Sequence, residues 1–130
     1  SFEKHLLYIL MFSRQYPDSG SVRTMLSDID KRIEEHLKPY EEEVTYFSFE
    51  GDEEPKTKKV KKTRRLVGGS VRAMSAICTQ IAMENVICSH YVLCVLSRMV
   101  ESLKDEDEKW DIRNRVYDKL CNCQSYFKLD

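Results

Sequence analysis

Residues 22–37, with the sequence VRTMLSDIDKRIEEHL, carry the clearest structural signal in the chain. Counted from Val22, the apolar side chains fall at offsets 0, 3, 4, 7, 11 and 15, with charged residues between them. This spacing places the apolar side chains on one face of an α-helix. Ser19 or Ser21 can cap the first turn by accepting from free backbone N–H groups, and Pro39 blocks continuation. The segment therefore predicts an amphipathic helix.

Four further segments show helical spacing. The first covers residues 3–16 and ends in a turn that contains Pro and Gly, and another begins at Ser70 and weakens near Glu84. A third begins at Ser89, and the last covers residues 108–123. We expect this last helix to bury Trp110, Ile112, Val116 and Leu120. The chain has only 4 Gly and 3 Pro, too few for the many tight turns of a barrel or sandwich, so we expect an all-α fold.

The overall composition fits one helical domain that comprises residues 1–130. Hydrophobic residues make up 42% of the chain and charged residues 33%, a mixture that can bury a core. The 21 Lys and Arg nearly cancel the 22 Asp and Glu, which excludes a histone-like polycation. No apolar run approaches the roughly 18 residues that span a bilayer. We therefore expect an intracellular protein with no membrane contact.

Residues 40–67 break the helical pattern with two blocks of opposite charge. Seven acidic side chains and no basic one lie in residues 41–54, and seven basic side chains lie in residues 56–65. Residues 44–49 are β-branched and aromatic in character, and residues 50–52 favour a turn. Two interpretations stay open at this point. The segment is either a small hairpin with opposite charges facing each other or a long solvated insertion between helices.

The basic block is the one segment whose composition points to a specific role. It resembles a nuclear localisation sequence, which favours a nuclear over a cytoplasmic location. Its charge would also attract phosphates, so a nucleic-acid-binding module is an alternative function. The adjacent acidic block could instead neutralise it within a solvated loop. The basic residues are Lys56, Lys58, Lys59, Lys61, Lys62, Arg64 and Arg65.

No segment shows the residue pattern of a catalytic or cofactor site. Nucleophile elbows, phosphate loops and metal-binding pairs of histidines are absent from the sequence, and its three histidines are scattered. Five cysteines cannot all pair internally, and the apolar positions of several favour reduced, buried thiols over a zinc site. They are Cys78, Cys88, Cys94, Cys121 and Cys123. We therefore expect no enzyme, no cofactor and no metal.

A short motif recurs at three helix starts. Residues 20–25 (GSVRTM) return as residues 69–74 (GSVRAM), and residues 110–113 (WDIR) form a looser copy. The Val or Ile residues of the copies lie 49 and 41 residues apart, close to the roughly 40–47 residues of a two-helix solenoid repeat. The arginine after each one can reach a carboxylate or carbonyl group of the neighbouring repeat. We therefore expect a ladder of structural arginines, formed by Arg23, Arg72 and Arg113.

Residues 95–113 and the helix that follows them resemble a HEAT repeat junction. In that family an apolar helix ends in a short acidic turn, and the next helix opens with Asp and a Val/Ile-Arg pair. Residues 70–82 are similar to the same second-helix pattern. The chain departs from the pattern at Arg115 and Tyr117, where small residues are usual, and in the insertion at residues 40–67.

The resemblance implies a short α-solenoid of antiparallel helix pairs, part of a larger helical-repeat scaffold that holds protein partners. The alternative fold is a closed, Bcl-2-like helical bundle that binds a partner helix in a groove. Exposed repeat ends would also allow a homo-oligomer. Exposed aromatic side chains carry interface energy, so those near the C-terminus are candidate partner contacts, although a core position stays open for the tryptophan. These candidates are Trp110, Tyr117, Tyr126 and Phe127.

Overall fold

The computed structural model describes residues 1–47 and 54–122 of the chain. Within these residues the protein has five α-helices, one short 3-10 helix and one two-stranded sheet. The prediction of an all-α fold is thus roughly right, but a small antiparallel hairpin is also present. The helices are α1 (Phe2–Gln15), α2 (Ser21–Leu37), α3 (Gly68–Glu84), α4 (Ser89–Glu101) and α5 (Glu106–Asn122). The remaining elements are η1 (Val86–Cys88), β1 (Tyr40–Tyr46) and β2 (Lys56–Lys62).

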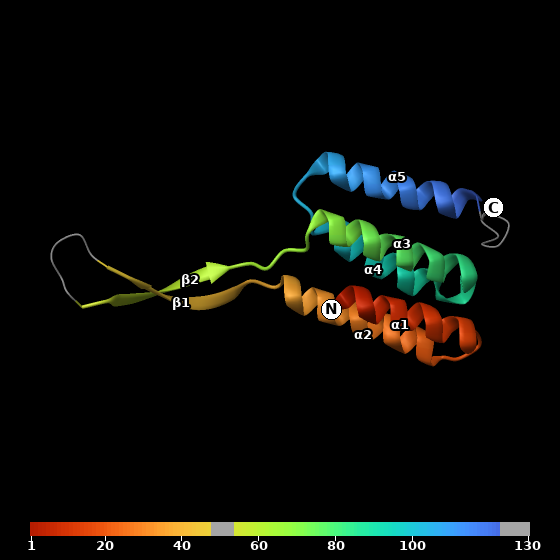
Figure 1. Ribbon diagram of the computed structural model, residues 1–130, viewed down its shortest axis with the longest axis horizontal. Helices are drawn as coiled ribbons and strands as arrows, with labels where there is room; N and C mark the ends of the chain where they lie inside the picture. Colours follow the sequence, from red (N-terminus) through yellow and green to blue (C-terminus); the bar gives the residue numbers. More distant parts are fainter. Residues whose placement is uncertain (48–53, 123–130) are drawn as a thin grey trace.

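The helices form antiparallel pairs that lie on one another. Helix α1 packs against α2, and α3 packs against α4 (Figure 1). Between the pairs, α1 packs on α3 and α2 packs on α4, so the two pairs are stacked in the same orientation. Helix α5 continues the row of α1 and α3 by packing on α3, with a smaller contact to α4. The described helices therefore occupy two layers, one with α1, α3 and α5 and one with α2 and α4.

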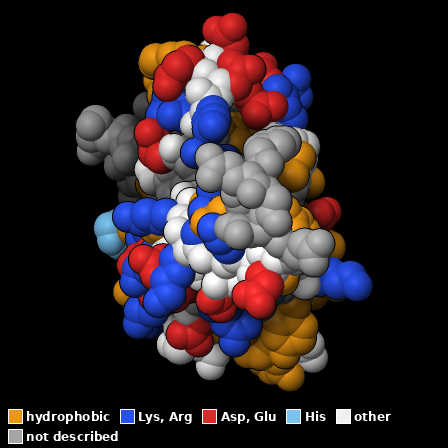
Figure 2. All heavy atoms as spheres, turned by 90° about the vertical axis from the view of Figure 1, so that its left-hand side faces the viewer, with side chains coloured by type: hydrophobic (Ala, Val, Ile, Leu, Met, Phe, Trp, Pro, Cys, Tyr) orange, Lys and Arg blue, Asp and Glu red, His pale blue; other side chains and the backbone are white. Residues whose placement is uncertain are grey.

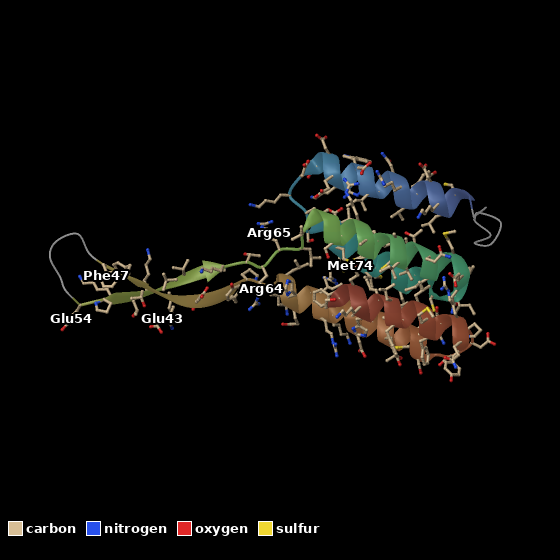
Figure 3. The ribbon with its side chains drawn as sticks, in the orientation of Figure 1. Glu43, Phe47, Glu54, Arg64, Arg65 and Met74 are labelled. Atoms are coloured by element: carbon tan, nitrogen blue, oxygen red, sulfur yellow. The ribbon has the colours of Figure 1, made fainter. Side chains whose placement is uncertain are left out.

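The core lies between the two layers and between the stacked pairs. The apolar face that the sequence predicts for α2 is confirmed, with Val22, Leu26, Ile29 and Ile33 fully buried. Helix α3 supplies Met74, which is 1% exposed and points into the helical body (Figure 3). Because the apolar faces of all five helices meet in one cluster, the helices form a single packed unit.

The predicted burial pattern of the last helix is only partly right. Ile112 of α5 is buried, and Val116 and Leu120 are partly buried against the core. Trp110, however, is 58% exposed. Two residues correspond to about 200° of rotation around a helix, so Trp110 and Ile112 cannot both face α3. The prediction of a buried Trp110 is therefore wrong.

The charged insertion forms a β-hairpin between α2 and α3. Strands β1 and β2 are antiparallel, with Tyr40 opposite Lys62 and Tyr46 opposite Lys56. The hairpin projects away from the helical body as a two-stranded ribbon (Figure 1). Its strand residues are exposed or half-buried. Of the two interpretations left open by the sequence, the hairpin is the one observed. The predicted turn at residues 50–52 lies outside the described residues.

Candidate interaction surfaces

Two of the three predicted ladder arginines form ion pairs between helices. Arg72 of α3 contacts Asp111 of α5, and Arg113 of α5 contacts Glu101 of α4. The hydrogen bond from Arg72 lowers the pKa of the Asp111 carboxyl. Arg23 forms no ion pair with a carboxylate of the described residues. The arginine motif therefore identifies part of the network that connects the helices, but not all of it.

Two further arginines, which the sequence motif does not single out, connect the stacked pairs. Arg14 of α1 binds Glu84 of α3 through Nε and Nη2, at 2.6 and 2.8 Å, and this contact lowers the pKa of the Glu84 carboxyl. Arg98 of α4 binds Asp30 of α2 through the same two atoms, at 2.7 and 3.3 Å. Each pair joins residues about 70 positions apart in the sequence. No local pattern could have matched these partners.

The three motif copies occupy different places in the fold. Residues 20–25 begin α2, which lies in one layer, whereas residues 69–74 begin α3 and residues 110–113 lie in α5, both in the other layer. The arginines of the first two copies also differ, since among the described residues Arg72 pairs with a carboxylate and Arg23 does not. The first two copies mark helix starts, where Ser21 and Ser70 precede the first buried apolar side chains, although α3 begins at Gly68 and not at Ser70 as predicted. The prediction of a third helix start at residues 110–113 is wrong, because α5 begins at Glu106 and these residues lie inside it.

An apolar groove of about 420 Å³ lies between α4 and α5. It is lined mainly by Leu93, Leu96, Val100, Val116, Tyr117 and Leu120. Two of these side chains are unusually accessible for their type, Leu93 at 47% and Tyr117 at 67%. The Arg113–Glu101 ion pair joins the two helices at the groove, and the Arg113 guanidinium also lies 5.3 Å from the centre of the Trp110 ring. The groove thus combines exposed apolar surface with an aromatic margin.

The structure places the predicted contact aromatics in two classes. Trp110 and Tyr117 are exposed on α5, where a partner could reach them. Both are well placed to contribute to an interface, and Tyr117 lines the groove directly. Tyr126 and Phe127 lie outside the described residues. Leu93 was missed by the sequence reasoning, because it was counted with neither the core nor the aromatic contacts.

The basic block forms strand β2 and the link to α3. Its lysines face β1, where Glu41 is opposite Lys61 and Glu43 is opposite Lys59. Lys62 forms an ion pair with Glu42, with 2.8 Å between Nζ and Oε2. Seen from the side of the hairpin, acidic and basic side chains are intermixed on the surface (Figure 2). Much of the positive charge of the block is therefore balanced within the ribbon.

Cations also contact the two tyrosines of the ribbon. Lys58 Nζ lies 5.3 Å from the centre of the Tyr46 ring, and the Arg64 guanidinium lies 4.1 Å from that of Tyr40. Arg64 and the neighbouring Arg65 stand at the base of the hairpin (Figure 3). There they line a cleft of about 570 Å³ together with residues of α4. Because Arg98 in the same cleft is already bound to carboxylates of α2, the cleft has less free positive charge than its arginines suggest.

The cysteines fall into buried and exposed groups. Cys78 and Cys88 are buried, and burial raises the pKa of the Cys78 thiol to about 12. Cys94 and Cys121 are free and exposed, so the expectation of burial is wrong for these two. Cys94 of α4 lines the cleft at the base of the hairpin, and Cys121 lies in the last turn of α5. Cys123 lies outside the described residues.

Comparisons with known proteins give no family assignment. No family model, no curated protein and no solved structure matches the chain. None of the helices in the described part of the chain is long and apolar enough to cross a membrane.

Proposed function

We propose that the chain is a non-enzymatic protein–protein interaction domain, a HEAT-like piece of α-solenoid that binds an amphipathic helix of a partner. The two-layer stack supports this proposal, since each helix pair packs on the next one in the same orientation. In a closed bundle, by contrast, the helices surround a common centre and leave no open end. A larger helical-repeat parent protein and a nuclear location belong to the same proposal, as expectations from the sequence.

The α4–α5 groove is the observation that carries the proposal. Helices α1 and α3 each have an antiparallel partner in the second layer, namely α2 and α4. Among the described residues α5 has no such partner, and the groove lies where that helix would pack. An occupant in this place would run antiparallel to α5 and would cover Leu93 and Tyr117.

The chemistry of the groove defines the occupant. Its lining is predominantly aliphatic and aromatic, so it fits a helix with apolar side chains at positions i, i+3 or i+4, and i+7. The exposed Tyr117 ring is the natural anchor, because tyrosine is among the residues that carry most interface energy, and the Leu93 side chain adds apolar area beside it. A second copy of the chain could occupy the same place only if one of its own helices offered this pattern.

The test is a selection of amphipathic helical peptides against the folded protein. Trp110 is the only tryptophan of the chain, and its position next to Arg113 at the groove makes its fluorescence a direct reporter of binding. We expect selected peptides to change this fluorescence and to lose at least about tenfold in affinity for a Leu93→Glu/Tyr117→Ala variant.

The opposite end of the stack offers a matched control. On α1, Leu7 is 44% exposed and Tyr8 is 60% exposed, close to the values for Leu93 and Tyr117. A Leu7→Glu/Tyr8→Ala variant should bind the peptides with unchanged affinity. The proposal fails if the selected peptides depend on the α1 residues instead, or if no helical peptide binds. Concentration-dependent dimerisation that Leu93→Glu abolishes would identify a second copy as the occupant.

Nucleic-acid binding by the basic block is the weaker alternative. Three lysines of β2 lie opposite or diagonal to carboxylates of β1, which reduces the net charge on which the affinity for a phosphate backbone mainly depends. The ribbon also lacks a continuous aromatic platform on its basic strand, where stacked bases would lie.

A further inference from the structure

The hairpin is a sheet with two free edges. Within the described residues, β1 and β2 pair with each other, and neither strand packs extensively on a helix. A two-stranded hairpin is only marginally stable in water, and a third strand adds a ladder of backbone hydrogen bonds. Each outer edge of this ribbon therefore presents backbone N–H and C=O groups with which a further strand could pair.

The two edges differ strongly in charge. Strand β1 carries three glutamates and strand β2 carries five lysines. All three glutamates have a lysine of β2 opposite or diagonal to them, at Lys59, Lys61 and Lys62. The lysines outnumber the glutamates, and Arg64 and Arg65 extend the positive edge toward α3. The positive charge of the two strands therefore lies along β2.

We propose that the free edge of β2 binds an acidic, extended segment of a partner protein as a third strand. Such a strand would lie about 4.8 Å from β2 and about twice as far from β1, so the lysines would stand between the two acidic strands. Main-chain hydrogen bonds supply affinity in this binding mode, and alternate side chains supply specificity.

The register of the ribbon predicts the pattern of the bound segment. Successive side chains of a strand point to opposite faces, so Lys59 and Lys61 share one face and Lys58 and Lys62 share the other with Val60 between them. We expect acidic side chains opposite the lysines and an apolar side chain opposite Val60. A nucleic acid cannot use the backbone edge in this way, because it offers no matching ladder of amide groups.

Charge also makes a symmetric pairing of two hairpins unfavourable. Two copies that joined edge to edge through β2 would bring lysines together, and pairing through β1 would bring glutamates together. A second copy could place its acidic β1 on β2, but that contact would be heterologous and would propagate into open chains. A partner strand is therefore the better occupant.

The experiment titrates the whole chain with a seven-residue peptide that matches the length of β2, with Val opposite Val60, Thr opposite Thr57 and Glu at the other five positions. Backbone amide shifts of β2 are followed by NMR at low ionic strength, where surface charges are little screened. We expect shifts along β2, and we expect binding to be lost when alternate peptide nitrogens are methylated. Equal binding of the methylated peptide would overturn strand addition, because its charge is unchanged.

Two paired variants separate charge from hairpin stability. Lys59→Gln/Lys61→Gln and Glu41→Gln/Glu43→Gln remove the same two cross-strand pairs, so they weaken the hairpin alike. The lysine variant should lose about fivefold in peptide affinity, whereas the glutamate variant should lose none, since a surface charge pair contributes modestly. Equal losses in both variants would overturn the proposal.

Further arms identify competing occupants. Tighter binding of a short double-stranded DNA than of the peptide, with the same shifts, would assign the edge to nucleic acid and overturn the proposal. Self-association that the glutamate variant abolishes would assign it to a second copy. The groove variant Leu93→Glu/Tyr117→Ala should bind the acidic peptide normally, so failure at one surface is distinguishable from failure at the other.

Discussion

Replacing Arg98 with Met should destabilise the protein by about 2 kcal/mol. The guanidinium of Arg98 makes three contacts across the two stacked pairs, at 2.7 and 3.3 Å to Asp30 and at 3.1 Å to Glu34. Hydrogen bonds to charged groups contribute about 1.5–3 kcal/mol, and loss of one partner leaves the other unpaired. The Asp30 side chain is only 19% exposed, which raises the cost of leaving it unpaired, whereas Arg98 is 34% exposed, so water screens part of the interaction.

Urea and thermal unfolding followed by circular dichroism measure this effect. A loss of about 2 kcal/mol lowers the melting temperature of a domain of this size by about 8 °C. Arg115→Met is the matched control, because Arg115 is 71% exposed and its pair lies within one helix, so its loss should matter much less. In a double-mutant cycle, Arg98→Met should cost less unfolding free energy in an Asp30→Asn background than in the unmodified protein, because no unpaired carboxylate then remains at residue 30. Equal effects of the two arginine variants, or strict additivity in the cycle, would refute the reasoning.

Three further predictions concern single side chains. The pKa of the Glu84 carboxyl is lowered in the folded state, so its ionised form stabilises the fold fully above pH 4.5, its ordinary pKa. This contribution to the unfolding free energy is lost as the pH falls through the lower folded pKa. Glu84→Gln should therefore flatten the acid limb of a curve of stability against pH. Maleimide labelling with peptide mapping should modify Cys94 rapidly and leave Cys78 unmodified until the protein unfolds. The buried Ser75 hydroxyl has no hydrogen-bond partner among the described residues, so Ser75→Ala should raise the unfolding free energy by about 0.5–1.5 kcal/mol. Ser13→Ala is the control and should raise it less, because the Ser13 hydroxyl donates to the Leu10 carbonyl at 2.7 Å.

The helices were predictable because their signals are local. Residues 22–37 combine a complete apolar stripe with a proline stop, and the observed helix, Ser21–Leu37, differs by one residue. The predicted start of α4 at Ser89 is also confirmed. The predicted cap of α2 by Ser19 or Ser21 is wrong, because Gly20 is the N-cap residue and no side chain caps the helix, although the Ser19 hydroxyl accepts from the Ser21 N–H at 3.2 Å. Periodicity and proline stops act within a few residues, so the chain alone reveals them.

The contacts between helices were less predictable, because they depend on which faces meet. Trp110 has an apolar side chain at a helical position, yet α5 lies at the margin of the stack and can bury only the face that carries Ile112. Arg14 and Arg98 have no distinguishing sequence context, and their partners become neighbours only after the pairs stack. The choice between hairpin and irregular insertion stayed open for a similar reason, since cross-strand charge pairs form only in the correct register.

The two proposed surfaces follow from one physical argument but predict opposite responses to salt. In each case an element is open on one side: among the described residues α5 lacks a helix in the second layer, and β2 lacks a strand on its outer side. The groove offers apolar side chains, so its affinity for a helix should change little with ionic strength. The β2 edge attracts its strand through lysines exposed to solvent, so its affinity should fall as salt screens them. A partner that engages both surfaces would therefore lose one contact at high salt and keep the other.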